Sequence, residues 1–285
     1  MKVFLDFDLT LYNSYRIKAQ CKTAYFPESE KDVIDFYRSN TPYVLLGSGH
    51  NVILSKEFYD QSFLIFNGNF NSIDLNKATG LIEAEAGISM LEISEIALKH
   101  GLSGLEIFYD IPSSLGGAVV MNAGASGEEI KDVLVKVRYL DLVDMTVKEI
   151  KKEEMGFEYR NSFFQRNTDK VVLKVWLKLN QGNQESIRIK MDTIKESRWA
   201  KQPKDFPNAG SVFKRPSGYY VGAIMDELNL KGFTIGGAKI SEKHGGFIVN
   251  FNNAKGEDIL QIINEVKNRV FEKFKIDLEI EQRII

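Results

Sequence analysis

Short apolar runs and longer amphipathic runs alternate along the first third of the chain. The apolar runs at 3–7, 43–47 and 62–67 predict strands, because β-branched and aromatic side chains favour extended backbone. Residues 29–39 begin with a serine cap and continue with apolar side chains at helical spacing, which predicts a helix. Residues 89–101 predict a second helix, with His100 in its last turn and Gly101 as its C-cap.

The middle of the chain has a different periodicity. Apolar and polar residues alternate at 133–142, 145–150 and 170–179, as they do in an antiparallel sheet. Residues 181–202 are charged and helical in pattern, and Pro203 and Pro207 follow them. This change of character makes 182–190 the expected domain boundary.

The last third of the chain predicts a mixture of helices and strands. The expected elements are helices around 221–229 and 256–274, a strand at 246–250 and a strand-like tail at 277–285. The tail is too apolar to be left exposed to solvent, so we expect it to pack against another part of the chain.

Composition narrows the class of protein. The chain has 285 residues, of which 44% are hydrophobic, so it can form two domains with sizeable cores. Its net charge of −2 and its lack of a long basic block argue against nucleic acid as a partner. The segment 195–216 is locally basic, and it is either an anion site or a solvated surface.

Cysteine, histidine and apolar content indicate the compartment. Cys21 is the only cysteine, so we expect no disulfides and a reducing compartment. The three histidines are far apart in the sequence and there is only one cysteine, so we predict no metal site. Asp6 and Asp8 interrupt the N-terminal apolar run, and no run is long enough to span a membrane. We therefore expect a soluble cytoplasmic protein with no membrane insertion.

The N-terminal stretch VFLDFDLTL offers one enzymatic alternative. Asp6 and Asp8 after an apolar strand resemble the first motif of haloacid-dehalogenase-like phosphatases, whose first Asp is a nucleophile and whose second is an acid or base. That chemistry also needs a later acidic pair to complete a Mg²⁺ site, and no such pair follows an apolar strand here. The phosphatase therefore stays a remote alternative.

Two glycine-rich stretches suggest that a ligand approaches the backbone closely. Residues 109–127, YDIPSSLGGAVVMNAGASG, are almost free of charge and crowded with Gly, Ala and Ser, and LLGSGHN at 45–51 is a second tight turn after a strand. Such turns can aim consecutive backbone N–H groups at a diphosphate. Neither is a Rossmann fingerprint or a Walker loop, so a nucleotide would bind in another mode.

Five segments in this order resemble the family of UDP-N-acetylenolpyruvoylglucosamine reductases, of its shorter type. They are GLSGLEIFYDIPSSLGGAVVMNAGASG, YRNSFF at 159–164, KQPKDFPNAGSVFKRP at 201–216, LKGFTIGGAKISEKHGGFIVN at 230–250 and LEIEQRII at 278–285. The resemblance implies an α+β fold, with a two-subdomain FAD-binding fold of the vanillyl-alcohol-oxidase type and a C-terminal α/β substrate-binding domain. It implies subdomain 1 at 1–70 joined by 276–285, subdomain 2 at 71–185, and the substrate domain at 186–275.

The resemblance also implies FAD as the cofactor, NADPH as the hydride donor and a UDP-sugar enolpyruvyl ether as the substrate of peptidoglycan precursor synthesis. We expect a monomer that works with these small molecules. The implied FAD-binding residues line both glycine-rich stretches: Gly47, Ser48, Gly49, His50, Asn51, Pro112, Ser113, Ser114, Gly116, Gly117, Asn122, Ala123 and Gly124.

Three residues match the family's catalytic positions. Arg160 would bind the substrate carboxylate in a planar fork, Glu281 would help to polarise that carboxylate, and Ser211 would donate a proton to the neighbouring carbon. The implied substrate contacts are Tyr159, Lys201, Lys214, Arg215 and His244.

Departures from the family pattern leave alternatives open. His50 follows Gly49 where the family has Ser-Asn, so His50 either contacts the diphosphate or attaches FAD covalently, as in certain related oxidases. Asp110 and Ser113 replace glycines, and the first 40 residues fit only loosely. A flavoprotein oxidase or a non-catalytic flavin-binding paralogue therefore remains possible, although Arg160, Ser211 and Glu281 are all present and favour the reductase.

Overall fold

The computed structural model describes residues 1–285, which divide into two compact units. Unit 1 comprises residues 1–3, 25–48 and 63–197, and unit 2 comprises residues 4–24, 49–62 and 198–285. Unit 2 therefore collects three separate parts of the sequence, and the strand-like tail belongs to it. The division cuts through strands near the N-terminus, where one four-stranded sheet has the order β1 (Lys2–Asp8), β2 (Gln20–Phe26), β5 (Phe58–Ile65) and β3 (Tyr43–Leu46).

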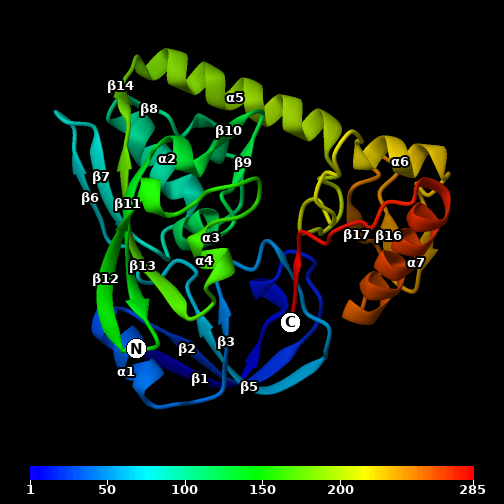
Figure 1. The fold of residues 1–285 in the computed structure, drawn as a ribbon, viewed down its shortest axis with the longest axis horizontal. Coiled ribbons are helices and arrows are strands. Elements are labelled where there is room, and N and C mark those ends of the chain that lie inside the picture. The colour runs from blue at the N-terminus through cyan, green and yellow to red at the C-terminus, as the bar shows by residue number, and fades with distance from the viewer. The chain divides into compact units, whose positions relative to one another are not determined.

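An antiparallel sheet forms the frame of unit 1 (Figure 1). Its strand order is β12 (Thr146–Lys151), β11 (Leu134–Asp141), β13 (Lys170–Lys178), β7 (Leu81–Glu85) and β6 (Ile73–Asn76). The alternation at 133–142, 145–150 and 170–179 predicts the three longest strands of this sheet, β11, β12 and β13, which are adjacent. The register pairs Val137 with both Ile150 and Val175. The antiparallel arrangement is confirmed.

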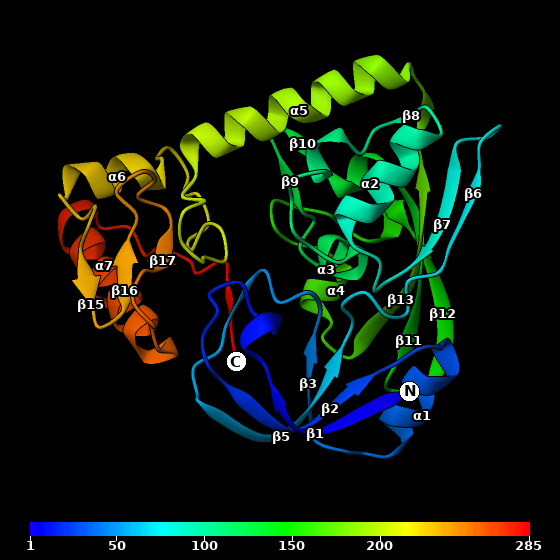
Figure 2. The same cartoon turned by 180° about the vertical axis from the view of Figure 1, so that it is seen from behind.

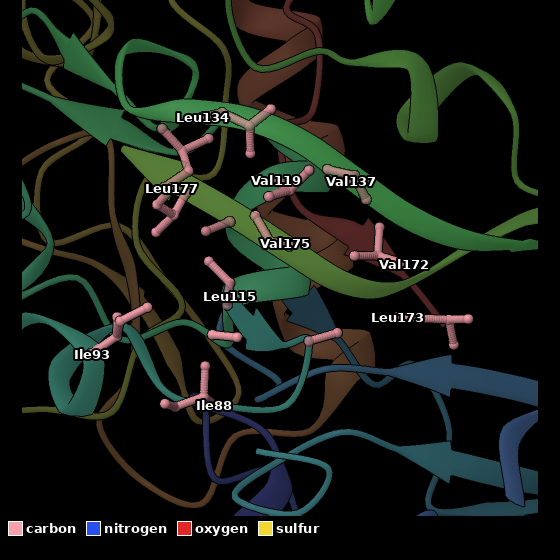
Figure 3. Close-up of a cluster of buried hydrophobic side chains, with 14 of the residues drawn as sticks. Ile88, Ile93, Leu115, Val119, Leu134, Val137, Val172, Leu173, Val175 and Leu177 are labelled. Carbon is pink, nitrogen blue, oxygen red and sulfur yellow. The ribbon is translucent and has the colours of Figure 1, made fainter. Parts of the chain in front are cut away.

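The core of unit 1 lies between this sheet and a short helix, α3 (Leu115–Val120) (Figure 3). Leu115 and Val119 of α3 face Val175 and Leu177 of β13 and Leu134 of β11 in this cluster, and all five side chains are buried. The glycine-rich stretch thus folds as a helix on the sheet, with its apolar positions in the core and its glycines and serines toward the ends.

Helices and short elements complete unit 1. Ser29 caps α1 (Glu30–Arg38), and Ser89 caps α2 (Met90–Lys99), each by accepting a bond from the backbone N–H three residues on. His100 is the C-cap of α2, and Gly101 follows with a φ of 69°. The remaining elements are β8 (Leu102–Ser103), η2 (Glu106–Phe108), β9 (Gly124–Ala125), β10 (Glu128–Glu129), η3 (Ile130–Asp132), η4 (Lys152–Glu154), α4 (Phe163–Arg166) and β14 (Asn180–Gln181).

A long helix, α5 (Gln184–Lys201), carries the chain from unit 1 into unit 2. In unit 2, α7 (Gly256–Phe274) packs on a three-stranded sheet in the order β15 (Thr234–Ile235), β16 (Ala238–Ile240) and β17 (Ile248–Asn250), as Figures 1 and 2 both show. The other elements are η1 (Thr10–Tyr12), β4 (Val52–Ile53), α6 (Val221–Glu227) and β18 (Arg283–Ile284). The helices predicted at 181–202, 221–229 and 256–274 are all present.

The strand in the C-terminal tail is shorter than the strand-like stretch predicted at 277–285. Only β18 is a strand, and it runs parallel to β4, with Arg283 opposite Val52. Residues 277–282 form no strand: Ile280 makes an isolated β-bridge to Phe213, and Glu279 and Glu281 form backbone bonds to Lys214 and Val212. None of the helices is both long and apolar enough to cross a bilayer.

Candidate active site

The turn after β3 belongs in part to each unit, since the division falls between Ser48 and Gly49. In unit 2, Gly49 has a φ of 72°, and a Cβ at this position would lie 1.9 Å from the Tyr12 carbonyl oxygen. The Gly49 carbonyl accepts a bond of 3.0 Å from the Ser14 N–H. Only glycine fits here, and the resulting tight turn presents His50 and Asn51 beside the 12–16 segment.

In unit 1 the two glycine-rich stretches meet. The Ser114 N–H donates to Ser48 Oγ at 3.0 Å, and a Cβ on Gly47 would lie only 2.8 Å from Ser114 Oγ. Ser113 lies alongside, with its hydroxyl donating to the Ser114 carbonyl at 2.9 Å. Gly116 and Gly117 follow in the first turn of α3. These residues come from two distant segments and are predicted to bind FAD together. In the structure the two segments are in contact.

Asn122 is the most constrained of the predicted cofactor residues. It is 0% exposed and has a φ of 43°, a left-handed conformation that costs a non-glycine residue about 1 kcal/mol. Its Nδ2 donates to the Glu129 carboxylate at 3.0 Å and to the Glu158 carbonyl at 2.9 Å. Its Oδ1 accepts from the Lys131 N–H at 3.4 Å. The amide is thus used inside the protein, where it ties the turn at 122–124 to the turn that carries Arg160.

Arg160 lies at the corner of a tight turn between Glu158 and Asn161. These two residues exchange backbone bonds of 3.1 and 3.2 Å, and Arg160 has a φ of 53°. The Arg160 guanidinium donates to the carbonyl oxygens of Asn122 at 3.4 Å and Gly124 at 2.8 Å. It also lies 5.1 Å from the ring centroid of Tyr159. The residues predicted for the carboxylate and for the flavin are therefore in direct contact within unit 1.

Replacing Asn122 by aspartate should destabilise the protein strongly. The new carboxylate would face the Glu129 carboxylate and the Glu158 carbonyl, and it has no proton to give either of them. We expect a loss of about 2–3 kcal/mol in the free energy of unfolding, measured with urea. Asn67→Asp, on an exposed bend, is the matched control; a normal stability for Asn122→Asp would show that the amide contacts are unimportant.

In unit 2 the C-terminal tail brings Glu281 to Ser211. The Glu281 N–H donates to the Val212 carbonyl at 2.8 Å, and the Lys214 N–H donates to the Glu279 carbonyl at 2.9 Å. Ser211 also bridges to Phe247 on the opposite side. The Asn51 side chain donates to the Glu281 carbonyl at 3.1 Å, so the glycine turn at 49–51 adjoins the same place. Four segments far apart in sequence therefore meet at Ser211 and Glu281.

His50 is held in its neutral form. Its ring Nδ1 contacts the Ser14 hydroxyl, and the ring is largely surrounded by protein. Burial, with the positive charge of Arg16 as a second and smaller cause, lowers the pKa of His50 to about 4. Arg16 is exposed and was not among the predicted site residues. It places a cation near the turn at which a diphosphate is expected.

This pKa shift predicts a pH dependence of stability in protein freed of flavin. The unfolded histidine, with an ordinary pKa of 6.5, binds a proton at pH values where the folded His50 does not. The free energy of unfolding should therefore fall as the pH is lowered from 7.5 to 5, with His50 contributing about 2 kcal/mol of that fall. Burial lowers the pKa of His244 too, so part of the fall remains without His50.

Urea denaturation of wild type and His50→Gln at several pH values checks this prediction. The His50→Gln variant should lose less stability than wild type over the same range. Parallel curves for wild type and His50→Gln would contradict a neutral, buried His50.

The predicted substrate residues have different surroundings. Lys214 pairs with the Glu279 carboxylate, and the Arg215 guanidinium lies 3.8 Å from the ring centroid of Tyr220. His244 Nδ1 accepts from the Gly246 N–H at 3.1 Å, so the proton of the neutral ring is on Nε2, which can donate to a ligand. Lys201 is exposed at the last residue of α5.

The N-terminal acidic motif has a structural explanation. Asp8 accepts from the Thr10 N–H at 2.8 Å, and hydrogen bonds to Thr10 lower the pKa of Asp8. Asp6 sits in an exposed strand with a φ of 47°. Asp8 therefore has a turn-forming role in this segment, and no cluster of three or more His, Cys, Asp or Glu side chains could hold a metal ion.

The donor set of these turns suits a flavin nucleotide. In unit 1, the Ser48 and Ser114 hydroxyls accept bonds from backbone N–H groups and so keep their own protons to donate to a ligand. In unit 2, the neutral His50 ring lies near the Arg16 cation. Each of these groups is of a kind that binds a diphosphate. The side chains at the junction of the two stretches are small, so a planar ring system can reach the backbone. The residues present therefore fit FAD.

Comparisons with known proteins agree with this arrangement. Residues 22–150 match the FAD binding domain family, and residues 202–285 match the family described as UDP-N-acetylenolpyruvoylglucosamine reductase, C-terminal domain. The UDP-N-acetylenolpyruvoylglucosamine reductase of Francisella tularensis is 39% identical over 97% of this chain and 98% of its own length. That of Caldanaerobacter subterraneus is 39% identical over 100% of this chain and 94% of its own length.

A solved structure gives the same result for the fold. The crystal structure of UDP-N-acetylenolpyruvylglucosamine reductase from Thermus caldophilus has a TM-score of 0.83 and 31% identity, and the match covers 99% of this chain and 98% of that one. The predicted α+β class and FAD-binding fold are confirmed, and FAD is the cofactor that this fold binds.

Proposed function

The chain belongs to the UDP-N-acetylenolpyruvoylglucosamine reductase family, and from that premise we propose that it reduces the enolpyruvyl ether of UDP-N-acetylglucosamine to UDP-N-acetylmuramate. NADPH is the hydride donor, and the product is a precursor of peptidoglycan. The observation that carries the proposal is the pairing of the C-terminal tail with residue 212, because it places Glu281 beside Ser211.

FAD is held by the residues at the junction of the two glycine-rich stretches and by the turn at 49–51. Bound there, FAD would supply hydride transfer from NADPH to the terminal carbon of the enolpyruvyl group. In unit 1, we assign Ser48, Ser114 and residues 113–117 to FAD binding. In unit 2, we assign His50 and Asn51 to it, with Arg16 as a cation near His50.

The remaining steps belong to the chain's own side chains. Hydride addition leaves negative charge on the substrate carboxylate, and Arg160, oriented by the carbonyls of Asn122 and Gly124, stabilises that charge. Glu281 helps to polarise the same carboxylate. Ser211 donates the proton to the neighbouring carbon; a serine hydroxyl is a weak acid, but a carbanion-like carbon is basic enough to take its proton.

The anionic UDP-sugar is bound by cations and donors of the C-terminal third. Arg215, held against Tyr220, and the Nε2–H of His244 are suited to this role, and Lys201 and Lys214 add positive charge.

We retain the division into FAD subdomains 1–70 with 276–285 and 71–185, and a substrate domain at 186–275. We also propose that the enzyme works as a monomer in the cytoplasm, where its one cysteine, the buried Cys21, stays reduced.

Steady-state kinetics of the purified protein tests the function. NADPH oxidation should depend on UDP-N-acetylglucosamine enolpyruvate, and mass spectrometry should show a product heavier by two hydrogens. Consumption of oxygen with release of hydrogen peroxide would identify a flavoprotein oxidase instead. Flavin that remains in the acid-precipitated protein would show covalent attachment, and its complete release would exclude a covalent bond to His50.

A further inference from the structure

A buried glutamine follows Glu281 directly in the tail. Gln282 is 4% exposed, and its Nε2 points at three successive carbonyl oxygens, those of Ala209 at 3.0 Å, Gly210 at 3.3 Å and Ser211 at 3.4 Å. Carbonyl oxygens only accept, so the Gln282 amide must be their donor. A single buried side chain thus holds the backbone turn that leads into Ser211.

Tyr15 fixes the direction of this amide. Its hydroxyl donates to Gln282 Oε1 at 2.9 Å, and Tyr15 is 0% exposed. Burial raises the pKa of Tyr15, so the hydroxyl keeps its proton and remains a donor. The Tyr15 carbonyl in turn accepts from Asn250 Nδ2 at 2.8 Å. With Oε1 occupied by Tyr15, the Nε2 end of Gln282 has to face the turn at 209–211.

The turn itself needs such a support. Gly210 has a φ of 81°, and the segment just after it is paired on one side with Glu281 and on the other with Phe247. The Glu281 N–H holds the Val212 carbonyl in place. The Gln282 side chain holds the three carbonyls that come before it, those of residues 209–211. Adjacent residues of the tail therefore supply Glu281 to the site and orient Ser211 within it.

We propose that Gln282, with Tyr15 behind it, is a positioning residue for proton donation by Ser211. The inference rests on the proposed function, in which Ser211 protonates the reduced substrate. Gln282 does not touch the substrate; it keeps the Ser211 hydroxyl within reach of the carbon to be protonated. Displacement of a reacting group by about 1 Å can cost about 100-fold in rate, so a small relaxation of this turn has a measurable effect.

The test uses the FAD-loaded full-length enzyme and the variant Gln282→Met, which keeps the length of the side chain and removes both polar ends. We expect kcat to fall about 10- to 100-fold, while FAD content and the rate of flavin reduction by NADPH stay near wild type. Because proton transfer becomes slower, the solvent isotope effect on kcat should rise above that of wild type. A general loss of folded enzyme would lower kcat without changing that isotope effect.

Tyr15→Phe provides an independent variant that removes one oxygen only. It leaves Gln282 Oε1 without its donor, so the amide can turn, and we expect a several-fold fall in kcat with the same rise in isotope effect. The double variant Tyr15→Phe/Gln282→Met should melt no lower than Gln282→Met, because no buried hydroxyl is left unpaired. Its kcat should nevertheless stay as low as that of Gln282→Met, which separates positioning from stability.

Gln261→Met, on the exposed face of α7, is the matched control and should keep wild-type turnover. The proposal is overturned if Gln282→Met turns over within about 2-fold of wild type, or if its kcat falls with an unchanged isotope effect. If Gln282→Met does not fold, Tyr15→Phe decides by the same two readouts. A wild-type protein that binds FAD but shows no turnover would overturn the proposed function together with this inference, whereas an active wild type with unaffected variants overturns only this inference.

Discussion

Replacing Ser211 by alanine should stop the return of hydride to product while leaving flavin reduction by NADPH intact. Ser211 is the proposed proton donor, and the bonds that hold its segment are made by backbone groups, so the alanine variant keeps them. Without that proton the charged intermediate cannot go on to product, and it reverts to substrate by giving its hydride back. General acid catalysis is worth about 10²–10⁴-fold, and we expect a loss of kcat of about 1,000-fold or more.

Single-turnover measurements on Ser211→Ala check this expectation. The flavin should lose its absorbance with NADPH at the wild-type rate and, when substrate is added, should regain it about 1,000-fold or more slowly than in wild type. Ser72→Ala, on an exposed segment of unit 1, is the control and should complete both steps. Wild-type recovery of the flavin in Ser211→Ala would remove Ser211 from the mechanism and with it the positioning role of Gln282.

Arg160→Lys should have the second largest effect, although it preserves the positive charge. The guanidinium is planar, and it binds the carbonyls of Asn122 and Gly124 while it faces the carboxylate; an ammonium group cannot reproduce that geometry. We expect kcat/KM for the enolpyruvyl substrate to fall about 100-fold or more, as for loss of one oriented donor to a developing charge. The rate of flavin reduction by NADPH should change little.

A closely matched control lies in the same unit. Arg166 also donates to two backbone carbonyls, those of Met155 and Gly156, both at 2.8 Å, but it has no place in the proposed site. Arg166→Lys should therefore retain wild-type kcat/KM. Equal losses in Arg160→Lys and Arg166→Lys would mean that the Arg160 effect is structural, and carboxylate binding would have to be assigned elsewhere.

Local sequence signals predicted much of the fold. Ser89 and Gly101 bracket α2, and the alternation in 133–142 and 170–179 reports a sheet with one buried face, because both features depend on nearest neighbours. Strand β2, at Gln20–Phe26, was not predicted. Polar and apolar residues mix irregularly there, and its strand state depends on pairing with β1 and β5, which only the complete fold supplies.

For the site, as for the fold, local sequence motifs were predictive, whereas contacts between distant residues were not. The glycines, serines and catalytic candidates could be read from motifs, yet the partners that orient them could not. Gln282 looks like a surface residue of an apolar tail until Tyr15, 267 residues earlier, is placed against it. Glu129 likewise gains its importance only because the left-handed Asn122 turns its amide toward it.

Anaerobic stopped-flow absorbance of the purified protein tests the central claim most directly. NADPH is mixed with the FAD-loaded enzyme first, and UDP-N-acetylglucosamine enolpyruvate is added afterwards, while the flavin band is followed. The account predicts bleaching by NADPH and rapid recovery of the flavin band only when this substrate is present. Bleaching without substrate-driven recovery, or a protein that cannot take up FAD at all, would contradict it.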